Sequence, residues 1–178
     1  MTERTLLYNC CDDDYTHFIP FFCAAALFSN DNIDIEIGIN LNKLTDDETE
    51  AIEKLKKMHP DCKILIKYDF YKKISGRLAT YDGMKMWPNS VRFVSEPEIK
   101  DTYTYISDID MMIMMKNFYD YHIDIMNQYK TIYSNWNRDV DRQCITGLHF
   151  CKTVEWYPID ITGIKLDIND EHLLMQIA

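Results

Sequence analysis

Apolar runs typical of buried strands alternate with segments of helical periodicity along the first half of the chain. The strand-like runs are Thr5–Cys11, Ile33–Asn40 and Cys62–Tyr68, and a helix is predicted at Phe18–Phe28. Strands that alternate with helices are typical of βαβ units, whose strands lie parallel in one sheet. The pattern therefore predicts an α/β fold with a mostly parallel central sheet.

A second helix is predicted to begin after Thr45. Thr45 and Glu48 match the capping box, in which each side chain accepts a hydrogen bond from a backbone N–H at the start of the helix. Apolar residues then recur on one face as far as Met58. Pro60 stops the helix, because proline offers no N–H and clashes with the preceding turn.

The second half of the chain has a less regular pattern. Tyr103–Ile113 is an apolar run that reads as a buried strand, and Cys144–Phe150 is another that contains a glycine. Helices are indicated around Ile123–Lys130 and at Asn169–Ile177. Residues 71–87 give no clear prediction, because two glycines interrupt the helical fragments.

Length and composition agree with a single domain over residues 1–178. The chain is 47% hydrophobic, which is enough for a core and excludes disorder. Its five glycines form neither a GxGxxG pattern nor a Walker A loop, so dinucleotide-binding and P-loop sites have no support. The net charge of −10 argues against nucleic-acid or anionic-membrane binding as the main activity.

No sequence feature predicts export or a membrane span. No stretch reaches the roughly 18 apolar residues that a span requires, and the N-terminus lacks the layout of a signal peptide. We expect a cytoplasmic protein and leave open attachment at the inner face of a membrane. The six cysteines show no CxxC spacing and lie mostly in apolar runs, so we expect free thiols that pack as small apolar side chains.

Asp108 and Asp110 stand near the end of the strand predicted at Tyr103–Ile113. Side chains at i and i+2 of a strand share one face, so these carboxylates would converge, and two like charges held together need a cation. Carboxylate oxygens are suitable ligands for Mg²⁺ and Mn²⁺. The alternative is that both acids are solvated turn residues.

A second acidic group, Asp12–Asp14, follows the first predicted strand. Ligands of open α/β sheets bind outside the carboxyl ends of the strands, where both acidic groups would lie. Two acidic strand ends in one sheet favour a site for a metal ion and a diphosphate.

Five segments, in this order along most of the chain, resemble motifs of one known family. They are Cys10–Tyr15, Val91–Phe93, Tyr105–Asp110, Ile145–Leu148 and Asp170–Leu174. Together they resemble the nucleotide-diphospho-sugar transferases of the GT-A fold, and in particular glycosyltransferase family 8 with its lipopolysaccharide galactosyltransferases. The resemblance implies a Rossmann-like GT-A fold.

The resemblance also implies which residues bind the donor. Asp12 would accept a hydrogen bond from a base N–H, and Tyr15 would stack on the base. Arg92, Thr146 and Gly147 would help to hold the nucleotide-sugar, although Thr146 stands where the family has a small residue. Simple packing is the alternative for Tyr15, and a surface ion pair is the alternative for Arg92.

For catalysis, the resemblance implies that Asp108 and Asp110 bind Mn²⁺ or Mg²⁺, which would bridge the donor phosphates. Asp170 and Glu171 would lie beside the anomeric carbon, where a carboxylate can stabilise an oxocarbenium-like transition state. The alternative for these two acids is an interaction with the dipole of the helix that they begin.

One part of the family pattern has no counterpart in residues 1–178. The family takes its third metal ligand, a histidine, and a diphosphate-binding lysine from a C-terminal segment. His149 or His172 would have to replace the histidine, and a packed core residue is the alternative for each. Trp87, Trp136 and Trp156 are candidates for stacking on an acceptor sugar, and packing is again the alternative.

The resemblance therefore implies a metal-dependent glycosyltransferase that moves a sugar, with retention, from a nucleotide-diphosphate donor to a saccharide acceptor of a surface glycan. The resemblance favours UDP as the nucleotide. The alternative is a non-catalytic binding or assembly protein on a shortened GT-A scaffold. A sugar-nucleotide pyrophosphorylase is disfavoured because residues 9–15 contain no glycine-rich loop.

Overall fold

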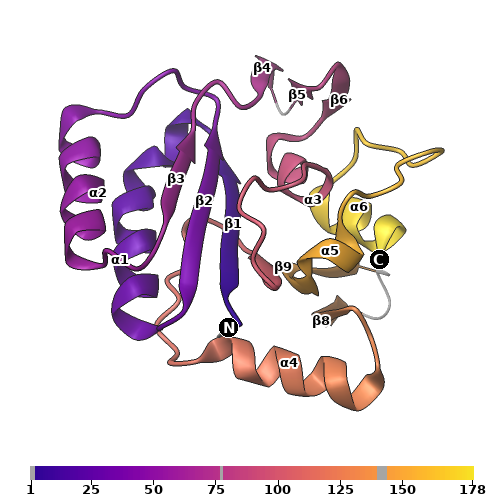
Figure 1. The fold of residues 1–178 in the computed structure, drawn as a ribbon. Coiled ribbons are helices and arrows are strands. Elements are labelled where there is room, and N and C mark those ends of the chain that lie inside the picture. The colour runs from indigo at the N-terminus through magenta and orange to yellow at the C-terminus, as the bar shows by residue number, and fades with distance from the viewer. Residues whose placement is uncertain (1–2, 77, 140–143) are drawn as a thin grey trace.

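The computed structural model describes residues 3–76, 78–139 and 144–178, without the side chains of residues 136–139 and 144. Its centre is a six-stranded sheet in the order β3-β2-β1-β7-β9-β8 (Figure 1). The strands are β1 (Thr5–Cys11), β2 (Ile33–Ile39), β3 (Ile64–Lys67), β7 (Tyr103–Ile106), β8 (Tyr133–Asp139) and β9 (Cys144–Lys152). The first four in spatial order are parallel to one another, and β9 runs antiparallel to both of its neighbours, β7 and β8. The predicted mostly parallel sheet is confirmed.

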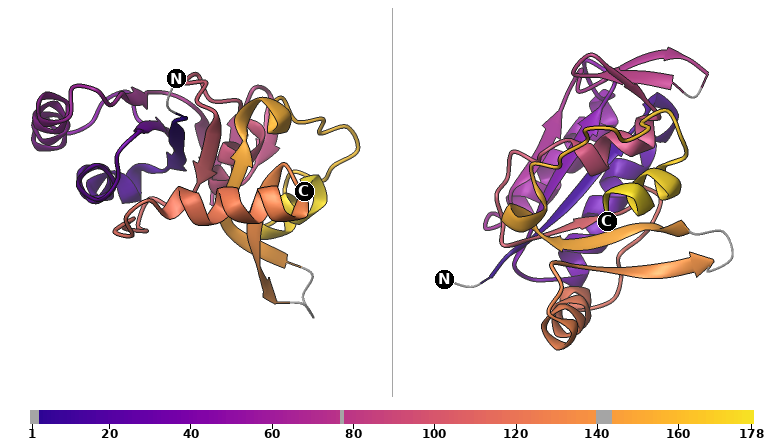
Figure 2. Two further views of the ribbon diagram at one scale, coloured as in Figure 1. Left: turned by 60° about the horizontal axis from the view of Figure 1, so that its bottom comes forward. Right: turned by 90° about the vertical axis from the view of Figure 1, so that its right-hand side faces the viewer.

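Helices cover both faces of this sheet (Figure 2). One face carries α1 (Ile19–Ser29), α2 (Asp46–Met58) and α4 (Phe118–Tyr129), and the other carries α3 (Val91–Val94), α5 (Thr153–Trp156) and α6 (Asp170–Ile177). Short 3₁₀ helices, η1 (Asp13–Phe18) and η2 (Pro88–Ser90), precede α1 and α3. Each face of the sheet packs against its helices in a separate hydrophobic core. Side chains of β1 alternate between the two cores: Leu7 packs on the face of α1, α2 and α4, and Leu6 and Tyr8 pack on the face of α3, α5 and α6.

A second, three-stranded antiparallel sheet is formed by residues that gave no clear sequence prediction. Its strands are β4 (Lys72–Ser75), β5 (Leu78–Tyr81) and β6 (Met84–Met86). Ala79 and Met86 are fully buried cross-strand partners, and they pack with Tyr71 and Cys10. Because Cys10 lies near the end of β1, this packing places the small sheet at the carboxyl end of the large one (Figure 1).

The helix predictions agree well with the structure. Thr45 and Glu48 form both hydrogen bonds of the capping box at the start of α2, which ends at Met58. Helix α6 begins after Asn169, whose side chain accepts a hydrogen bond from the backbone N–H of Glu171. These ends were predictable because local side chains satisfy the backbone groups there.

The prediction of one strand over Tyr103–Ile113 is wrong beyond Ile106. After Ile106 the chain leaves the sheet, and the N–H of Met111 bonds to the carbonyl of Asp108 in a turn. Methionines follow this turn, and Met114 and Met115 are exposed rather than buried. The apolar run was misread because its two methionines, Met111 and Met112, are exposed and do not enter the core.

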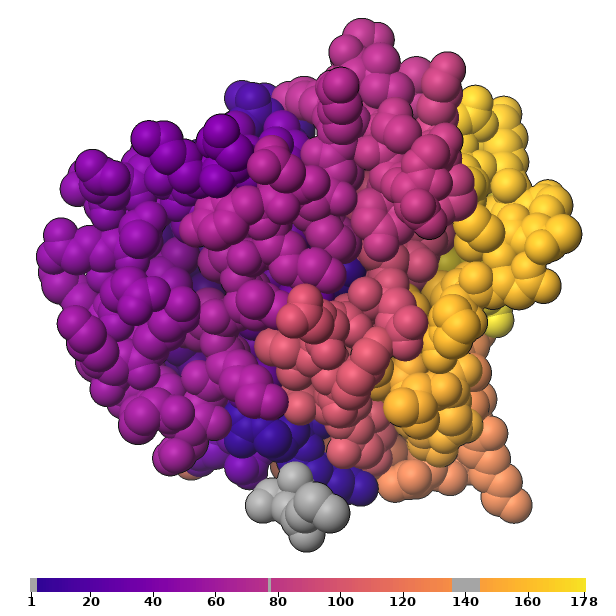
Figure 3. Space-filling model, turned by 45° about the horizontal axis from the view of Figure 1, so that its top comes forward, coloured from indigo at the N-terminus to yellow at the C-terminus, as the bar shows by residue number. Residues whose placement is uncertain are grey.

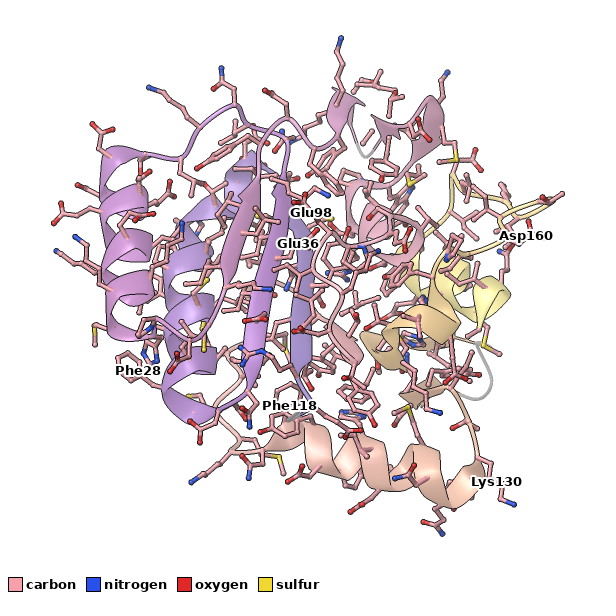
Figure 4. The ribbon with its side chains drawn as sticks, viewed as in Figure 1. Phe28, Glu36, Glu98, Phe118, Lys130 and Asp160 are labelled. Atoms are coloured by element: carbon pink, nitrogen blue, oxygen red, sulfur yellow. The ribbon has the colours of Figure 1, made fainter. Side chains whose placement is uncertain are left out.

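A buried carboxylate holds the segment that leads into β7. Glu36 on β2 is fully buried and accepts hydrogen bonds from the backbone N–H groups of Glu98 and Ile99, at distances of 2.8 to 2.9 Å (Figure 4). Lys67 lies 3.4 Å from the same carboxylate. Because residues 95–102 join α3 to β7, these bonds help to fix the relative positions of those two elements.

The cysteines behave largely as predicted. Cys10, Cys11, Cys23 and Cys151 are free and buried, and Cys62 is free and half-buried. Burial raises the pKa of the Cys10 and Cys23 thiols to about 12, so both stay protonated at neutral pH. The side chain of Cys144 lies outside the described residues. None of the described helices has the length and apolar character needed to cross a membrane.

Candidate functional site

A cavity of about 620 Å³ lies at the carboxyl ends of β1 and β7, between the two sheets and α6. In Figure 3, which brings this end of the molecule forward, the small sheet (magenta) and the C-terminal segment (yellow) lie side by side. Eight of the nine predicted site residues line the cavity: Asp12, Tyr15, Arg92, Asp108, Asp110, Gly147, Asp170 and Glu171. The fold therefore brings together residues from all five family-like segments.

Thr146 is the predicted residue that does not line the cavity. Its hydroxyl donates a hydrogen bond of 2.9 Å to the Oδ1 atom of Asn135 on the neighbouring strand β8. Successive residues of a strand point to opposite faces, so Gly147 reaches the cavity and Thr146 does not. A direct contact between the Thr146 side chain and a donor has no support in this geometry.

Arg92 is the buried centre of the site. Its side chain is 2% exposed, and its Nη2 atom lies 2.6 Å from Asp108 and 3.2 Å from Asp170. Its Nη1 atom donates a hydrogen bond of 2.8 Å to the carbonyl of Ser107. The guanidinium thus connects the end of β7 to the start of α6. Asp170, at the start of α6, lies 78 residues from Arg92 in the sequence.

Gly147 provides the space that Arg92 needs. A Cβ atom on Gly147 would lie 3.2 Å from the Nη2 atom of Arg92, and within 4 Å of the carboxylates of Asp170 and Asp108. A glycine fits here because the Cβ of a larger residue would press on these paired charges.

Asp108 and Asp110 both line the cavity, although they do not share a strand face. They lie at the first and third positions of the turn that follows β7. The turn, rather than strand alternation, brings both side chains to the cavity. Asp108 pairs with Arg92, and Asp110 is exposed.

The acidic residues after β1 surround one lysine. The Nζ atom of Lys73 on β4 lies 2.9 Å from Asp13, 3.6 Å from Asp12 and 3.8 Å from Asp14. The hydrogen bond between Lys73 and Asp13 lowers the pKa of Asp13 and raises that of Lys73. Lys73 also lines the cavity. It was missed in the sequence because it lies 60 residues from Asp13, in a segment without clear periodicity.

The charge of the cavity lining favours a bound cation. Six carboxylates line the cavity, against the basic side chains of Lys73 and Arg92 among the described residues. A diphosphate carries negative charge of its own, so a divalent ion is needed to hold it against this lining. Carboxylate oxygens are the hard donors that Mn²⁺ and Mg²⁺ take.

Two groups of acids could supply these oxygens. The carboxylates of Asp12, Asp13 and Asp14 offer atoms that all lie within 4.8 Å of one another. The ammonium group of Lys73 already neutralises part of that charge. Asp110 has no such basic neighbour among the described residues, which favours the turn after β7 as the place for an ion.

The histidines that could replace the family's third ligand do not line the cavity. His149 is fully buried in β9, where its ring packs on Tyr133 and Trp156. Burial lowers the pKa of His149 to about 3, so it is neutral and acts as a packed core residue. His172 is exposed near Asn169.

Of the three candidate tryptophans, Trp87 lines the cavity. Trp156 is buried in the core and makes the packing contact described for His149. The side chain of Trp136 lies outside the described residues.

Comparison with solved structures shows what the fold is similar to. The mannosyltransferase PcManGT from Pyrobaculum calidifontis, solved in complex with GDP-Man and Mn²⁺, superimposes with a TM-score of 0.62 at 12% sequence identity. The match covers 100% of this chain and 52% of that chain, so the present chain spans about half the length of its neighbour. No family model and no curated protein matches the sequence. The likeness confirms a GT-A glycosyltransferase fold, and it does not single out family 8.

Proposed function

We propose that this chain is a metal-dependent glycosyltransferase that moves a sugar from a nucleoside-diphosphate donor to a saccharide acceptor of a surface glycan. The observation that carries the proposal is the convergence of Asp108, Asp110, Asp170 and Glu171 on one cavity of a GT-A fold. The GDP-Man and Mn²⁺ held by PcManGT add support for this class of donor and ion.

The residues of the cavity have distinct roles in this proposal. Asp108 and Asp110 would hold Mn²⁺ or Mg²⁺, whose positive charge stabilises the diphosphate as it leaves. Arg92 keeps Asp108 and Asp170 in fixed positions through its two short ion pairs. Asp170 and Glu171, which line the cavity, would stabilise the developing positive charge of the sugar.

The finer features of the reaction rest on the resemblance to family 8. That resemblance implies retention of the anomeric configuration and a UDP-sugar as donor. Among the described residues, Lys73 and Arg92 are the basic residues of the cavity, and Lys73, the less buried of the two, would contact the diphosphate. Trp87 lines the cavity and would stack on a sugar ring.

The role of the turn after β7 can be tested by binding. We expect isothermal titration of the full chain to detect a nucleoside diphosphate, UDP or GDP, only when Mn²⁺ is present. Asp108→Ala and Asp110→Ala should each weaken this binding by at least about tenfold, because each removes a charged ligand of the ion.

Asp124→Ala is the matched control, because Asp124 is an exposed aspartate on α4 and does not line the cavity. Its affinity should equal that of the unaltered chain. If Asp108→Ala and Asp110→Ala both bind the nucleotide as tightly as the unaltered chain, the proposed metal site is wrong. Tight Mn²⁺-dependent binding without any donor hydrolysis or transfer would instead favour the non-catalytic alternative.

A further inference from the structure

Helix α1 is apolar on every side, although one of its sides faces solvent. Its residues include no charged side chain, whereas the neighbouring helix α2 carries five acidic and three basic ones. A helix that is apolar all round is normally covered all round. Phe21 and Phe28, on the outer side of α1, are nevertheless 65% and 64% exposed. An exposed apolar face of this kind indicates a contact with a partner.

The exposure of α1 follows a symmetric pattern along the helix. On either side of the midpoint between Ala24 and Ala25, residues at equal distances are buried to the same degree. Phe21 and Phe28 are both exposed, and Ala24 and Ala25 are both half-buried. The remaining pairs, half-buried or buried alike, are Pro20 and Ser29, Phe22 and Leu27, and Cys23 and Ala26. The outer face of α1 therefore presents the same arrangement when the helix is turned end over end.

This symmetry is the property that pairing with a second copy of the same helix requires. In a dimer with two-fold symmetry, a residue i of one copy meets a residue j of the other, and j meets i in return. Two antiparallel α1 helices would thus bring Phe21 of each copy against Phe28 of the other. The small side chains of Ala24 and Ala25 would lie at the crossing point, where they allow the helix axes to approach closely.

We propose that α1 is the centre of a two-fold dimer interface between two copies of this chain. A lipid surface is the other partner that an apolar helix face could take. Helices that lie on membranes are usually rich in lysine and arginine, of which α1 has none. The net charge of −10 also opposes approach to anionic lipids, and a membrane gives no reason for a symmetric pattern of exposure.

The area of the apolar face indicates a dimer of modest stability. The exposed parts of Phe21 and Phe28 amount to about 250 Å² per copy, taking roughly 200 Å² for an aromatic side chain. Exposed Met58 extends this face, because the neighbouring His59 packs its ring 5.1 Å from that of Phe28. A standard interface buries about 1,200 Å² or more in total, so we expect a dissociation constant on the order of micromolar.

The proposed dimer leaves both cavities open. Helix α1 begins directly after η1, whose Tyr15 lines the cavity, so the start of α1 points toward the cavity. Antiparallel pairing of the two helices therefore places the two cavities at opposite ends of the dimer. Nucleotide binding does not depend on this interface, and either proposal can fail while the other stands.

Sedimentation velocity of the full chain tests the interface. The mass should rise with concentration from the monomer value of 21.2 kDa toward twice that value. A monomer that persists at about 100 µM, roughly a hundred times the expected dissociation constant, would overturn the proposal. If that monomer also sediments with vesicles of phosphatidylcholine and phosphatidylglycerol, the apolar face binds lipid instead.

Phe21→Lys tests whether α1 forms the contact. It should weaken the dimer at least about a hundredfold, because the two-fold axis places the altered position in the interface twice. Val154→Lys is the matched control, since Val154 is an exposed apolar residue of α5, on the other face of the sheet. This control should dimerise like the unaltered chain. Equal dimerisation of the two variants would contradict the role of α1.

Mixing two variants is the sharpest test, because it examines the antiparallel register itself. Phe21→Lys and Phe28→Glu should each be monomeric when studied alone. In the mixed dimer the introduced lysine faces the introduced glutamate, and the remaining Phe21 and Phe28 face each other, so the mixture should dimerise. A mixture that stays monomeric would overturn the proposed pairing, provided that both variants share the thermal midpoint of the unaltered chain.

Discussion

At the scale of single residues, the site depends on the close approach of Gly147 and Arg92. The guanidinium of Arg92 is buried and pairs with two carboxylates, of which Asp108 is partly exposed, and the backbone at Gly147 beside it carries no side chain. Buried charges persist only when they are paired, so a small shift of Arg92 changes Asp108 and Asp170 together.

Gly147→Ala should therefore disturb the site more than the fold. The new methyl group would lie 3.2 Å from the Nη2 atom of Arg92 and push the guanidinium away from its carboxylates. We expect a loss of about tenfold in Mn²⁺-dependent nucleotide affinity and a destabilisation of roughly 1–3 kcal/mol from overpacking. Titration calorimetry and urea unfolding measure the two effects.

Thr146→Ala is the comparison for this variant, because Thr146 faces away from the cavity toward Asn135. Its nucleotide affinity should stay close to that of the unaltered chain. A loss as large as that of Gly147→Ala would show that the strand, rather than the cavity, is being perturbed.

Most side chains of the site were predictable because short motifs carry them. Asp12, Asp108 and Asp170 stand in segments whose order resembles one family, and all three line the cavity. Lys73 was not predictable, because its partner lies 60 residues away and only the tertiary fold brings the two together. Thr146 does not line the cavity, and the motif alone could not show this because it does not say which face of β9 each residue takes.

At the scale of elements, local sequence predicts helix ends better than strand ends. The capping box of α2 is satisfied within four residues of sequence, so it can be recognised without knowledge of the fold. The end of β7 depends on its neighbours, since its pairing with β1 ends at Ile106. The small sheet was missed because its strands are short and only its inner face is buried.

The capping box gives a prediction for α2. Thr45→Ala removes the acceptor for the N–H of Glu48, a hydrogen bond of 3.3 Å. It should lower the free energy of unfolding by about 1 kcal/mol, measured by urea titration. Thr49→Ala, at an exposed position inside the same helix, should leave stability unchanged or slightly higher, because alanine has the greater helix propensity. Equal losses in the two variants would contradict the capping role.

At the scale of the whole molecule, two buried histidines make stability depend on pH. Burial lowers the pKa of His122 to about 4 and that of His149 to about 3, from an ordinary value of 6.5. Both rings are neutral in the folded chain, whereas the unfolded chain protonates them below about pH 6.5. The contribution of the two neutral rings to stability is therefore complete above that pH. It decreases as the pH falls toward 4, and the loss is on the order of a few kcal/mol.

Asp101 acts in the opposite direction. Burial raises the pKa of its carboxyl to about 6 from 3.8, so the folded chain holds this proton more tightly than the unfolded chain. Its contribution is largest below about pH 4 and is lost as the pH rises through 6. The pKa shifts of the two histidines together exceed that of Asp101. We therefore expect the urea concentration at the unfolding midpoint to decrease as the pH is lowered from 7 to 5. His172→Gln, which changes an exposed histidine, should keep the same slope, and His122→Phe should flatten it.

The arrangement of the cysteines has a consequence for following the motions of this protein. Among the cysteines whose side chains the structure describes, the four buried thiols lie on β1, on α1 and on β9, in different parts of the molecule. A modifying reagent can reach each of them only when its own element opens, because the reactive thiolate forms only in contact with water. The rate at which each buried thiol is modified therefore measures how often its own element opens. Half-buried Cys62 is the reference for a thiol that water already reaches.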